Sequence, residues 1–345
     1  MPSQLMQTEV RLAQPGKFDL VANSLSDPPE GEARIRIRRI GICGTDIHAF
    51  HGRQPFFEYP RILGHELAAE IVALNGPSEL ITGDLVTVEP YLNDPNSPAS
   101  QTGKTNCCES LQVLGVHIDG GMRSEINVPI SKLHRAASAS VDQLALVEML
   151  CIGCHAVNRS QSNKVDNALI LGAGPIGLSA LSFLQTRTKN IAVADLDEGR
   201  LQFCREAFDV EHTIKVTPGE SLERSLREAF GGRLPDVIFD ATGNRDSMLS
   251  SFEMAAHGGR IVFIGLFQGR VEFDDPNFHK RELTLMASRN AVSAEFKEVI
   301  QAMESGQINT DPWITHRLHL DEVPERFGDV ISSPKLRKAV IHLDT

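Results

Sequence analysis

The stretch from residue 168 to residue 290 alternates short apolar runs with amphipathic segments, and no other feature constrains the fold as strongly. The intervening segments, such as Gly199–Phe208 and Ser221–Phe230, place apolar residues at helical spacing. Alternating strands and helices predict a parallel, doubly wound α/β sheet with helical crossovers. The expected strands are Ala168–Leu171, Ile191–Ala194, His212–Val216, Asp236–Asp240, Arg260–Gly265 and Leu283–Ala287.

A glycine-rich loop directly follows the first of these strands. Gly172, Gly174 and Gly177 form a G-x-G-x-x-G pattern that also contains Pro175 and Ile176. Such glycines permit a tight turn, let the backbone approach a pyrophosphate and let the helix meet the strand, while the helix N-terminus offers N–H donors to the anion. The loop therefore predicts a dinucleotide site in a Rossmann-type sheet; the alternative is a turn that only packs a strand on a helix.

An acidic residue at the end of the second strand bears on the choice of dinucleotide. Asp195 stands where the pattern expects a carboxylate that accepts hydrogen bonds from the adenosine ribose. Such a carboxylate repels a 2′-phosphate, so we expect NAD rather than NADP. Arg200 complicates this, because a nearby arginine can accommodate that phosphate, although it can equally be a solvated helix residue. Gly265, which ends the fifth strand-like run, completes the residues expected to contact the cofactor.

The first 150 residues and the C-terminal tail follow another pattern. Short strand-like runs separated by Gly, Pro and Asn predict an antiparallel, partly barrel-like domain rich in loops. Val141–Asn158 predicts one helix that bridges the two regions. We expect a catalytic domain of residues 1–150 and 291–345, and a nucleotide-binding domain of residues 151–290. The runs outside the latter are Ala33–Ile40, Ala68–Leu74, Asp84–Val88, Thr315–Leu320 and Lys338–Leu343, with a helix at Ser293–Ser305.

Charge and apolar content exclude several classes of partner. The net charge is −11 and no run is rich in lysine or arginine, so nucleic acid and anionic membranes are not expected partners. The N-terminal segment lacks the basic and apolar regions of a signal peptide, and the longest apolar stretch, Ala168–Leu184, is interrupted by glycine and proline. We therefore expect a cytoplasmic protein whose thiols stay reduced.

Thiol, imidazole and carboxylate groups recur at three separate places in the sequence. Cys43 follows a strand-like run, His65 stands beside Glu66, and Glu148 lies in an otherwise apolar helix, where an unpaired charge would cost roughly several kcal/mol. Zinc accepts all these groups, and a catalytic zinc site uses three protein ligands with one position left open. Taken singly, each has a plain explanation: a core cysteine, an interior histidine or a solvent-facing glutamate.

Taken together, these residues make the chain resemble the zinc-dependent medium-chain dehydrogenases, which include alcohol, sorbitol and threonine dehydrogenases. The motifs are G-I-C-G-T-D-I-H at 41–48, G-H-E at 64–66, V-E-x-L-x-x-G-x-H-A at 147–156, G-A-G-P-I-G at 172–177 and D-A-T-G at 240–243. The resemblance implies a GroES-like, mostly antiparallel β catalytic domain joined to the Rossmann domain. It also implies NAD-dependent oxidation of an alcohol, and dimers or tetramers.

The resemblance also assigns roles to the candidate residues. Cys43 and His65 are zinc ligands by this resemblance, and Glu66 is a ligand or an acid close to the metal. Glu148 takes the fourth position, either directly or through the metal's water.

Two further roles near the metal follow from the same resemblance. Thr45 is expected to contact the substrate hydroxyl, and His48 to pass its proton towards solvent through the cofactor ribose.

One stretch departs from the family pattern. Many members hold a second, structural zinc with four closely spaced cysteines, but Asp94, Ser97 and Ser100 stand here in place of thiols and only Cys108 remains. A lone thiolate cannot close a tetrahedral site. We therefore expect one catalytic zinc per chain, no structural zinc, and a lobe held by packing or by a subunit contact.

The substrate is expected to be a polyol or a sugar acid, because glutamates in place of further cysteines resemble the sorbitol and threonine dehydrogenase side of the family. Segments 53–61 and 278–290 resemble dehydrogenases that act on galactonate- or gulonate-like acids and related starvation-sensing proteins. Arg53 or Arg289 is a candidate to hold a carboxylate, although either can be a surface or cofactor-side residue.

Two rival functions stay open. A zinc-free quinone-type reductase shares the scaffold, but the intact Cys43, His65 and Glu66 argue against it. A non-catalytic NAD-binding regulator or sensor is the other, and the presence of Thr45 and His48 favours an enzyme over it.

Overall fold

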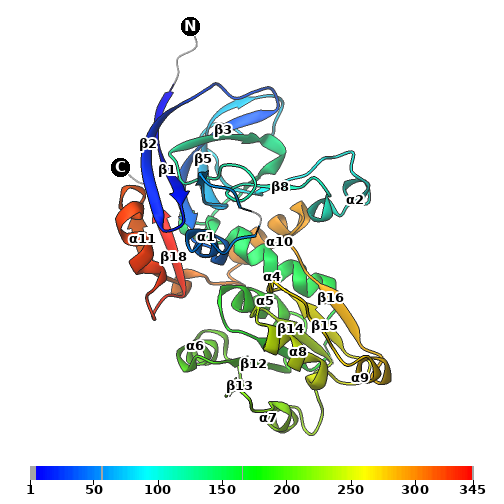
Figure 1. Cartoon of the computed structure of the whole chain (residues 1–345). Helices are drawn as coiled ribbons and strands as arrows, with labels where there is room; N and C mark the ends of the chain where they lie inside the picture. The colour runs from blue at the N-terminus through cyan, green and yellow to red at the C-terminus, as the bar shows by residue number, and fades with distance from the viewer. Residues whose placement is uncertain (1–4, 56, 165, 344–345) are drawn as a thin grey trace. The chain divides into compact units, whose positions relative to one another are not determined.

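The computed structural model describes residues 5–55, 57–164 and 166–343, and its contacts divide the chain into two compact units (Figure 1). The first unit comprises Met1–Glu148 and Val292–Thr345, and the second comprises Met149–Ala291. No helix in the described ranges is long and apolar enough to cross a membrane.

The second unit is built on a wholly parallel sheet with the strand order β13-β12-β11-β14-β15-β16. This order confirms the predicted doubly wound sheet, and ligands of such sheets bind beyond the carboxyl ends of the strands where the order reverses, here at β11 and β14. The strands are β11 (Ala168–Leu171), β12 (Ile191–Asp195), β13 (His212–Lys215), β14 (Val237–Asp240), β15 (Arg260–Phe263) and β16 (Thr284–Ala287).

Helices connect these strands, as the apolar spacing predicts. The strands β11, β12 and β14 are buried along their whole length, so they read as continuous apolar runs. The helices are α4 (Val147–Ser160), α5 (Pro175–Leu184), α6 (Glu198–Phe208), α7 (Glu223–Ala229), α8 (Arg245–Met254) and α9 (Asp275–Lys280).

The prediction of one helix over Val141–Asn158 is wrong. The chain forms a short helix, α3 (Val141–Leu144), and then α4. The amide of Leu146 donates to the carbonyl of Gln143, three residues back, so the turn tightens and the first helix ends. As a result α4 starts anew just before Glu148.

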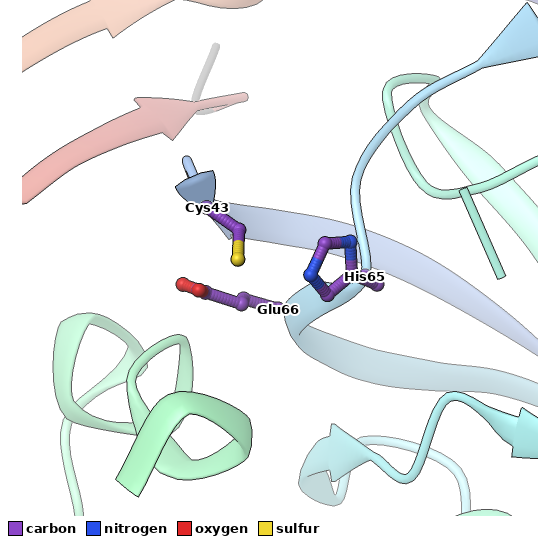
Figure 2. A group of neighbouring side chains, drawn as sticks. All are labelled: Cys43, His65 and Glu66. Atoms are coloured by element: carbon purple, nitrogen blue, oxygen red, sulfur yellow. The ribbon is translucent and has the colours of Figure 1, made fainter. Parts of the chain in front are cut away.

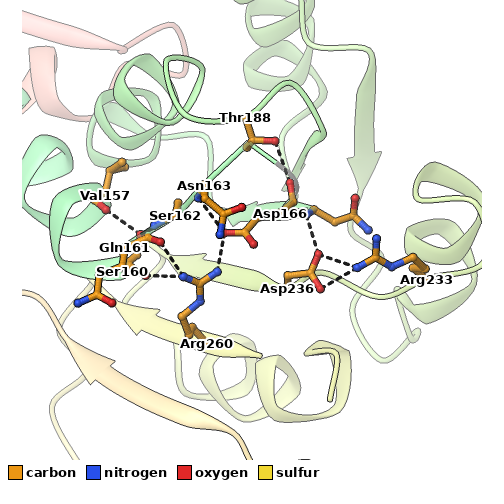
Figure 3. A network of polar contacts seen from close by, with 11 residues as sticks. Val157, Ser160, Gln161, Ser162, Asn163, Asp166, Thr188, Arg233, Asp236 and Arg260 are labelled. Atoms are coloured by element: carbon orange, nitrogen blue, oxygen red, sulfur yellow. Dashed lines mark hydrogen bonds and ion pairs between the residues drawn. The ribbon is translucent and has the colours of Figure 1, made fainter. Parts of the chain in front are cut away.

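A polar network fastens the end of α4 to the amino-terminal edge of the parallel sheet (Figure 3). The Arg260 guanidinium donates to the carbonyls of Ser160 and Gln161, at 2.8 and 2.9 Å, and to Asp166 Oδ2 at 2.5 Å. Arg260 begins β15 and Asp166 precedes β11, so this network closes the edge opposite the glycine loop.

The first unit is mostly antiparallel, as predicted for the catalytic domain. Its larger sheet has the order β10-β6-β5-β3-β18-β17, with β9 also paired to β3, and a smaller sheet has the order β2-β1-β4. The strands are β1 (Leu5–Gln14), β2 (Lys17–Leu25), β3 (Glu32–Gly41), β4 (Arg61–Ile62), β5 (Glu66–Asn75), β6 (Leu85–Val88), β7 (Tyr91–Leu92), β8 (Gln112–Val113), β9 (Glu125–Pro129), β10 (Leu133–Arg135), β17 (Ile314–His319) and β18 (Lys338–His342).

The core of this unit lies against β3. Ala33, Ile35 and Ile37 are fully buried, and they alternate with arginine side chains that are half-buried or exposed. The C-terminal strand β18, red in Figure 1, pairs antiparallel with the end of β3. The remaining helices are α1 (Gly44–Phe50), α2 (Pro98–Gln101), α10 (Ser293–Glu304) and α11 (Val323–Ile331).

Candidate functional site

Strand pairing brings the first metal-ligand candidates together. Gly41, the last residue of β3, lies opposite Glu66, the first residue of β5, so Cys43 and His65 emerge beside each other from the same end of the sheet. Cys43 is also the N-cap of α1, which turns the chain away from the sheet. The register of β3 and β5 thus brings Cys43 beside the consecutive residues His65 and Glu66.

The side chains of Cys43, His65 and Glu66 point toward one another (Figure 2). One ligand atom from each lies within 4.8 Å of the other two, and this is the one such group among the residues that the structure describes. His65 and Glu66 are buried and Cys43 is half-buried. Sulfur, imidazole nitrogen and carboxylate oxygen are the donors that zinc accepts.

Glu66 is held by a glycine and a lysine that sequence reasoning did not name as site residues or explain. A Cβ at Gly41 would overlap the Glu66 carboxylate, so only glycine leaves room for it. Nζ of Lys338, which is 2% exposed, forms an ion pair with Glu66 Oε2 and donates to the carbonyl of Ile42 at 3.0 Å. A charged residue that opens the apolar run of β18 was the available signal in the sequence.

Asp46 is a second residue that sequence reasoning did not assign. Its fully buried carboxylate accepts the amide of Cys43 at 2.8 Å and that of Gly64 at 3.4 Å. Oδ1 lies 3.8 Å from Nδ1 of His65, so the carboxylate faces the imidazole that it would orient. Burial raises the pKa of Asp46, although the nearby His65 opposes the shift.

The electrostatics of the group fit a bound cation. Burial alone would lower the pKa of His65, but the adjacent Cys43 and Asp46 raise it well above its ordinary value. Among the described residues, Nδ1 of His65 and Oε1 of Glu66 are buried without a hydrogen-bond partner, while Oε2 of Glu66 faces Lys338. Four groups that can carry a negative charge, Cys43, Asp46, Glu66 and Glu148, surround His65 and Lys338. A divalent ion would stabilise the anionic forms of such groups, so the residues present fit zinc.

Glu148 lies outside the group of three donors. The phenol of Tyr91 donates to its Oε1, and both side chains are nearly fully buried. Burial raises the pKa of Glu148, while His65, Tyr91 and Lys338 lower it. The structure therefore places Glu148 next to the candidate metal centre without adding it to the converging donors.

The two predicted proton-handling residues lie on α1. Thr45 and His48 are three residues apart, which places them on one side of this short helix. The side chain of Thr45 is half-buried and that of His48 is exposed. Partial burial of the His48 ring, with the charges of Arg53 and His51, lowers the pKa of His48, so its neutral form predominates near pH 7.

The two arginines proposed as carboxylate binders lie on different units. Arg53 follows the C-terminal end of α1, its amide donates to the carbonyl of His48 at 2.8 Å, and its side chain is exposed. Arg289 is exposed and follows β16 in the second unit.

The glycine loop has the backbone that its pattern predicts. Gly172 has φ +91°, and a Cβ at Gly177 would overlap the carbonyl oxygen of Gly172, so both positions need glycine. Gly174 is the N-cap of α5, and Pro175 and Ile176 form its first turn. The free amides of this helix start therefore stand at the carboxyl end of β11.

Asp195 closes this loop from the neighbouring strand. Its carboxylate accepts the amide of Ala173 at 2.6 Å and that of Asp197 at 2.8 Å. Nη1 of Arg200 lies 3.7 Å from Oδ2 of Asp195 and is the nearest heavy atom to a Cβ built on Gly174. The acid and the arginine thus form a pair over the glycine loop, where the ribose of a dinucleotide would lie.

Gly265 has a packing role at the same edge of the sheet. A Cβ on it would overlap the backbone of Gly243, which has φ +60° in the turn after β14. Asp240 shapes this turn by accepting the amide and hydroxyl of Thr242 at 2.9 and 2.6 Å. Two strand ends meet here at the edge that faces the predicted cofactor.

Comparisons with known proteins agree with this geometry. Residues 29–138 match the model of the alcohol dehydrogenase GroES-like domain, and residues 175–305 match that of the zinc-binding dehydrogenases. The chain belongs to the zinc-binding dehydrogenase family. A curated relative, the L-galactonate-5-dehydrogenase of Escherichia coli K12, is 41% identical over 316 residues, which cover 91% of this chain and 92% of that protein.

Two solved structures are similar over almost the whole chain. The alcohol dehydrogenase RspB of Escherichia coli CFT073, solved with NADH, is 28% identical with a TM-score of 0.91, and the match covers 98% of this chain and 99% of that one. A zinc-binding dehydrogenase of Sinorhizobium meliloti bound to NADP is 25% identical with a TM-score of 0.89 and covers 98% and 100%. The family thus contains members solved with either dinucleotide.

Hydrogen bonds hold the segment in which we expect no structural zinc. The Asp94 amide donates to Sγ of Cys108 at 3.3 Å, and the hydroxyl of Ser97 donates to that of Ser100 at 2.9 Å. Hydrogen bonds from Ser110 and Ser97 lower the pKa of the Cys108 thiol to about 7. Residues that replace thiols therefore contact the remaining cysteine or one another.

Proposed function

We propose that this zinc-binding dehydrogenase oxidises a secondary alcohol of a polyol or sugar acid to a ketone and transfers the hydride to NAD. The convergence of Cys43, His65 and Glu66 carries this proposal, because it offers three zinc donors on a rigid strand register. Three protein ligands leave the open position that a catalytic zinc needs.

The residues around the three donors suggest how the chain would handle the proton. Zinc, when bound, would lower the pKa of the substrate alcohol, as it lowers that of water to about 7. Thr45 would accept a hydrogen bond from the substrate hydroxyl and, as it takes that proton, release its own through the cofactor ribose to His48. His48 would pass the proton on to solvent, which its lowered pKa supports because the ring is neutral and can accept it.

The cofactor proposal is NAD in preference to NADP. Asp195 supports it, because its carboxylate already holds the glycine loop and would repel a 2′-phosphate. Arg200 lies 3.7 Å from Asp195, whose carboxylate would compete with a phosphate for it. The candidate cofactor residues Gly172, Gly174, Pro175, Ile176, Gly177 and Gly265 shape the same edge of the sheet.

A sugar acid is the first substrate to test. The relative named L-galactonate-5-dehydrogenase supports this choice, as does Arg53, a cation that lies near His48. We further propose one zinc per chain. We also propose a homodimer or homotetramer, and light scattering on the purified protein would measure its molar mass.

A substrate panel tests the proposed function. Aldonates and polyols are offered with NAD or NADP while the absorbance of the reduced cofactor is followed, and zinc is measured in the same sample. Turnover of an aldonate or polyol with NAD in the zinc-loaded enzyme is expected. NADH binding without turnover of any compound would support a regulator, and quinone reduction without zinc would support the quinone-type reductase.

A pair of cysteine variants tests the metal site. Cys43→Ser is expected to lose zinc and turnover while NADH binding, followed by its fluorescence, persists. Cys107→Ser is the matched control, because Cys107 is exposed and outside the donor group. Equal zinc content in both variants would contradict the site.

A further inference from the structure

Tyr91 is a buried hydrogen-bond donor that the roles proposed above leave unused. It begins β7 and is 2% exposed, and its phenol donates to Oε1 of Glu148, which is 4% exposed in the first turn of α4. A buried phenol normally has a hydrogen-bond partner, and the partner of Tyr91 is a carboxylate beside the candidate metal site.

The partner carboxylate faces the metal group. His65, Glu66 and Lys338 all act electrostatically on Glu148, so its carboxylate lies near them. Yet Glu148 is absent from the group whose donor atoms lie within 4.8 Å of one another, among the described parts of the chain. A carboxylate that is close to a cation site and still outside the converging donors needs a restraint.

Tyr91 is firmly anchored, so it can supply that restraint. Its ring packs edge-on against Phe296, with centroids 6.3 Å apart and planes at 71°. Two residues earlier, the buried Glu89 binds Lys132 Nζ at 2.5 Å and the hydroxyl of Ser293 at 2.5 Å. Glu89 Oε2 also lies 3.2 Å from Nε2 of His134 in β10. The backbone before Tyr91 is therefore tied to β10 and α10, and the phenol cannot follow a carboxylate that swings away.

We propose that Tyr91 is a positioning residue that keeps Glu148 from binding the metal directly and so preserves the open coordination position for an exchangeable ligand. The inference rests on the proposed function, because it takes Cys43, His65 and Glu66 as the zinc ligands. With one oxygen engaged by the phenol, Glu148 has its other oxygen to accept a hydrogen bond from the exchangeable ligand. Without the phenol, the carboxylate would close the site.

Cobalt-substituted protein tests this without turnover. Co²⁺ replaces zinc, and its visible spectrum reports the ligand set while imidazole is titrated as the exchangeable ligand. In the unchanged protein imidazole is expected to shift the spectrum. In Tyr91→Phe, which keeps the ring against Phe296, the starting spectrum is expected to differ and the imidazole Kd to rise about tenfold or more, the usual scale for removing a residue that orients a ligand.

Two more variants make the result specific. Tyr91→Phe combined with Glu148→Gln is expected to restore imidazole binding, because an uncharged amide is a poor zinc-site ligand. Tyr59→Phe is the matched control, because the Tyr59 phenol donates to the carbonyl of Ala49 and not to Glu148. Its imidazole Kd is expected to stay within about twofold of the unchanged protein, below the change expected for a lost orienting contact.

The outcomes separate this inference from the proposed function. If folded Tyr91→Phe gives the same cobalt spectrum and imidazole Kd as the unchanged protein, Tyr91 has no positioning role while the metal site stands. If Tyr59→Phe reproduces the effect of Tyr91→Phe, the contact with Glu148 is not responsible, and the inference is overturned. If Cys43→Ser binds cobalt with an unchanged spectrum, the metal site itself is misassigned and both proposals fall.

Discussion

The Lys338 and Glu66 pair shows how one residue can serve two states of the site. Lys338 is buried, so its ammonium needs a counter-ion, and Glu66 needs a cation for the same reason. Burial would lower the pKa of Lys338, but Glu66 and Cys43 raise it, so the lysine stays charged. The pair would thus hold the Glu66 carboxylate in place before a metal arrives.

Replacement of Lys338 is expected to cost stability mainly in the metal-free protein. Lys338→Met leaves Glu66 buried without a cation, which costs about 3 kcal/mol, whereas bound zinc would take over that compensation. Urea unfolding with a chelator and with zinc measures the difference. Lys338→Arg, which keeps the charge, is the control, and an equal loss in both conditions would contradict the argument.

The pKa of His48 gives a second prediction for single residues. Arg53 and His51 disfavour its charged form, beside the larger effect of partial burial, so the neutral form needed to accept a proton persists below the ordinary pKa. We therefore expect activity to fall only when the pH drops below the ordinary pKa of histidine. Arg53→Gln removes one cation, so the pKa of His48 rises and the acid limb of kcat/KM moves to higher pH.

The measurement of this shift is a pH profile of kcat/KM with a neutral polyol, which avoids any effect of Arg53 on a substrate carboxylate. Arg224→Gln, a change on the exposed surface of α7, is the control. An acid limb that stays in place, or moves to lower pH, would show that Arg53 does not act on His48.

Among the elements, α10 is joined to the sheet of the first unit by one buried acid. Glu89 accepts hydrogen bonds from His134 and Lys132 on one side and from Ser293, the first residue of α10, on the other. Burial would raise the pKa of Glu89, but His134 and Lys132 outweigh it and the pKa is lowered. The ionised acid therefore stabilises the folded state.

The sign of this shift sets a pH dependence. A lowered folded-state pKa adds stability in full above the ordinary value of 4.5 and loses it as the pH falls through the folded-state pKa. Glu89→Gln is expected to cost about 3 kcal/mol at pH 7 and progressively less below pH 4.5. Urea unfolding across this range measures it, with the exposed Glu79→Gln as control; a cost that stays constant with pH would refute the assignment.

Helix packing explains a glycine that the motif alone left unexplained. A Cβ on Gly153 of α4 would overlap Ser179 and the backbone of Ala180 in α5, and the Gly153 amide donates to the Ser179 hydroxyl at 3.1 Å. The two helices therefore approach closely because position 153 carries no side chain. Helical periodicity predicts the apolar face of α4 but not which neighbour requires a glycine.

For the whole molecule, the central prediction is one zinc per chain. Elemental analysis of the purified protein is expected to give one equivalent, lost in Cys43→Ser and retained in Cys108→Ser. The reason is that, in the described parts of the chain, the thiol of Cys108 contacts backbone and hydroxyl groups and belongs to no group of metal donors, whereas Cys43 meets a nitrogen and an oxygen donor. Two equivalents, or loss of zinc in Cys108→Ser, would contradict this.

Local patterns in the sequence were enough for the fold class and the family. The glycine loop and the apolar runs near Ala168 and Ile191 predict the parallel sheet because strand burial, tight turns and helix starts depend on neighbours within a few residues. Structure and comparisons confirm both the fold class and the family. The break between α3 and α4 was missed, since a single tightened turn leaves no periodic signal.

The candidate site depended on long-range packing. Sequence motifs pointed to Cys43, His65 and Glu66 as ligands, a role that stays a proposal, but their convergence comes from the register of β3 and β5. Lys338 reaches Glu66 from the far end of the chain, and Tyr91 reaches Glu148 from another loop. A sequence records which groups are present; which buried charge finds which partner is decided by tertiary contacts, because Coulomb and hydrogen-bond energies depend on distance in space.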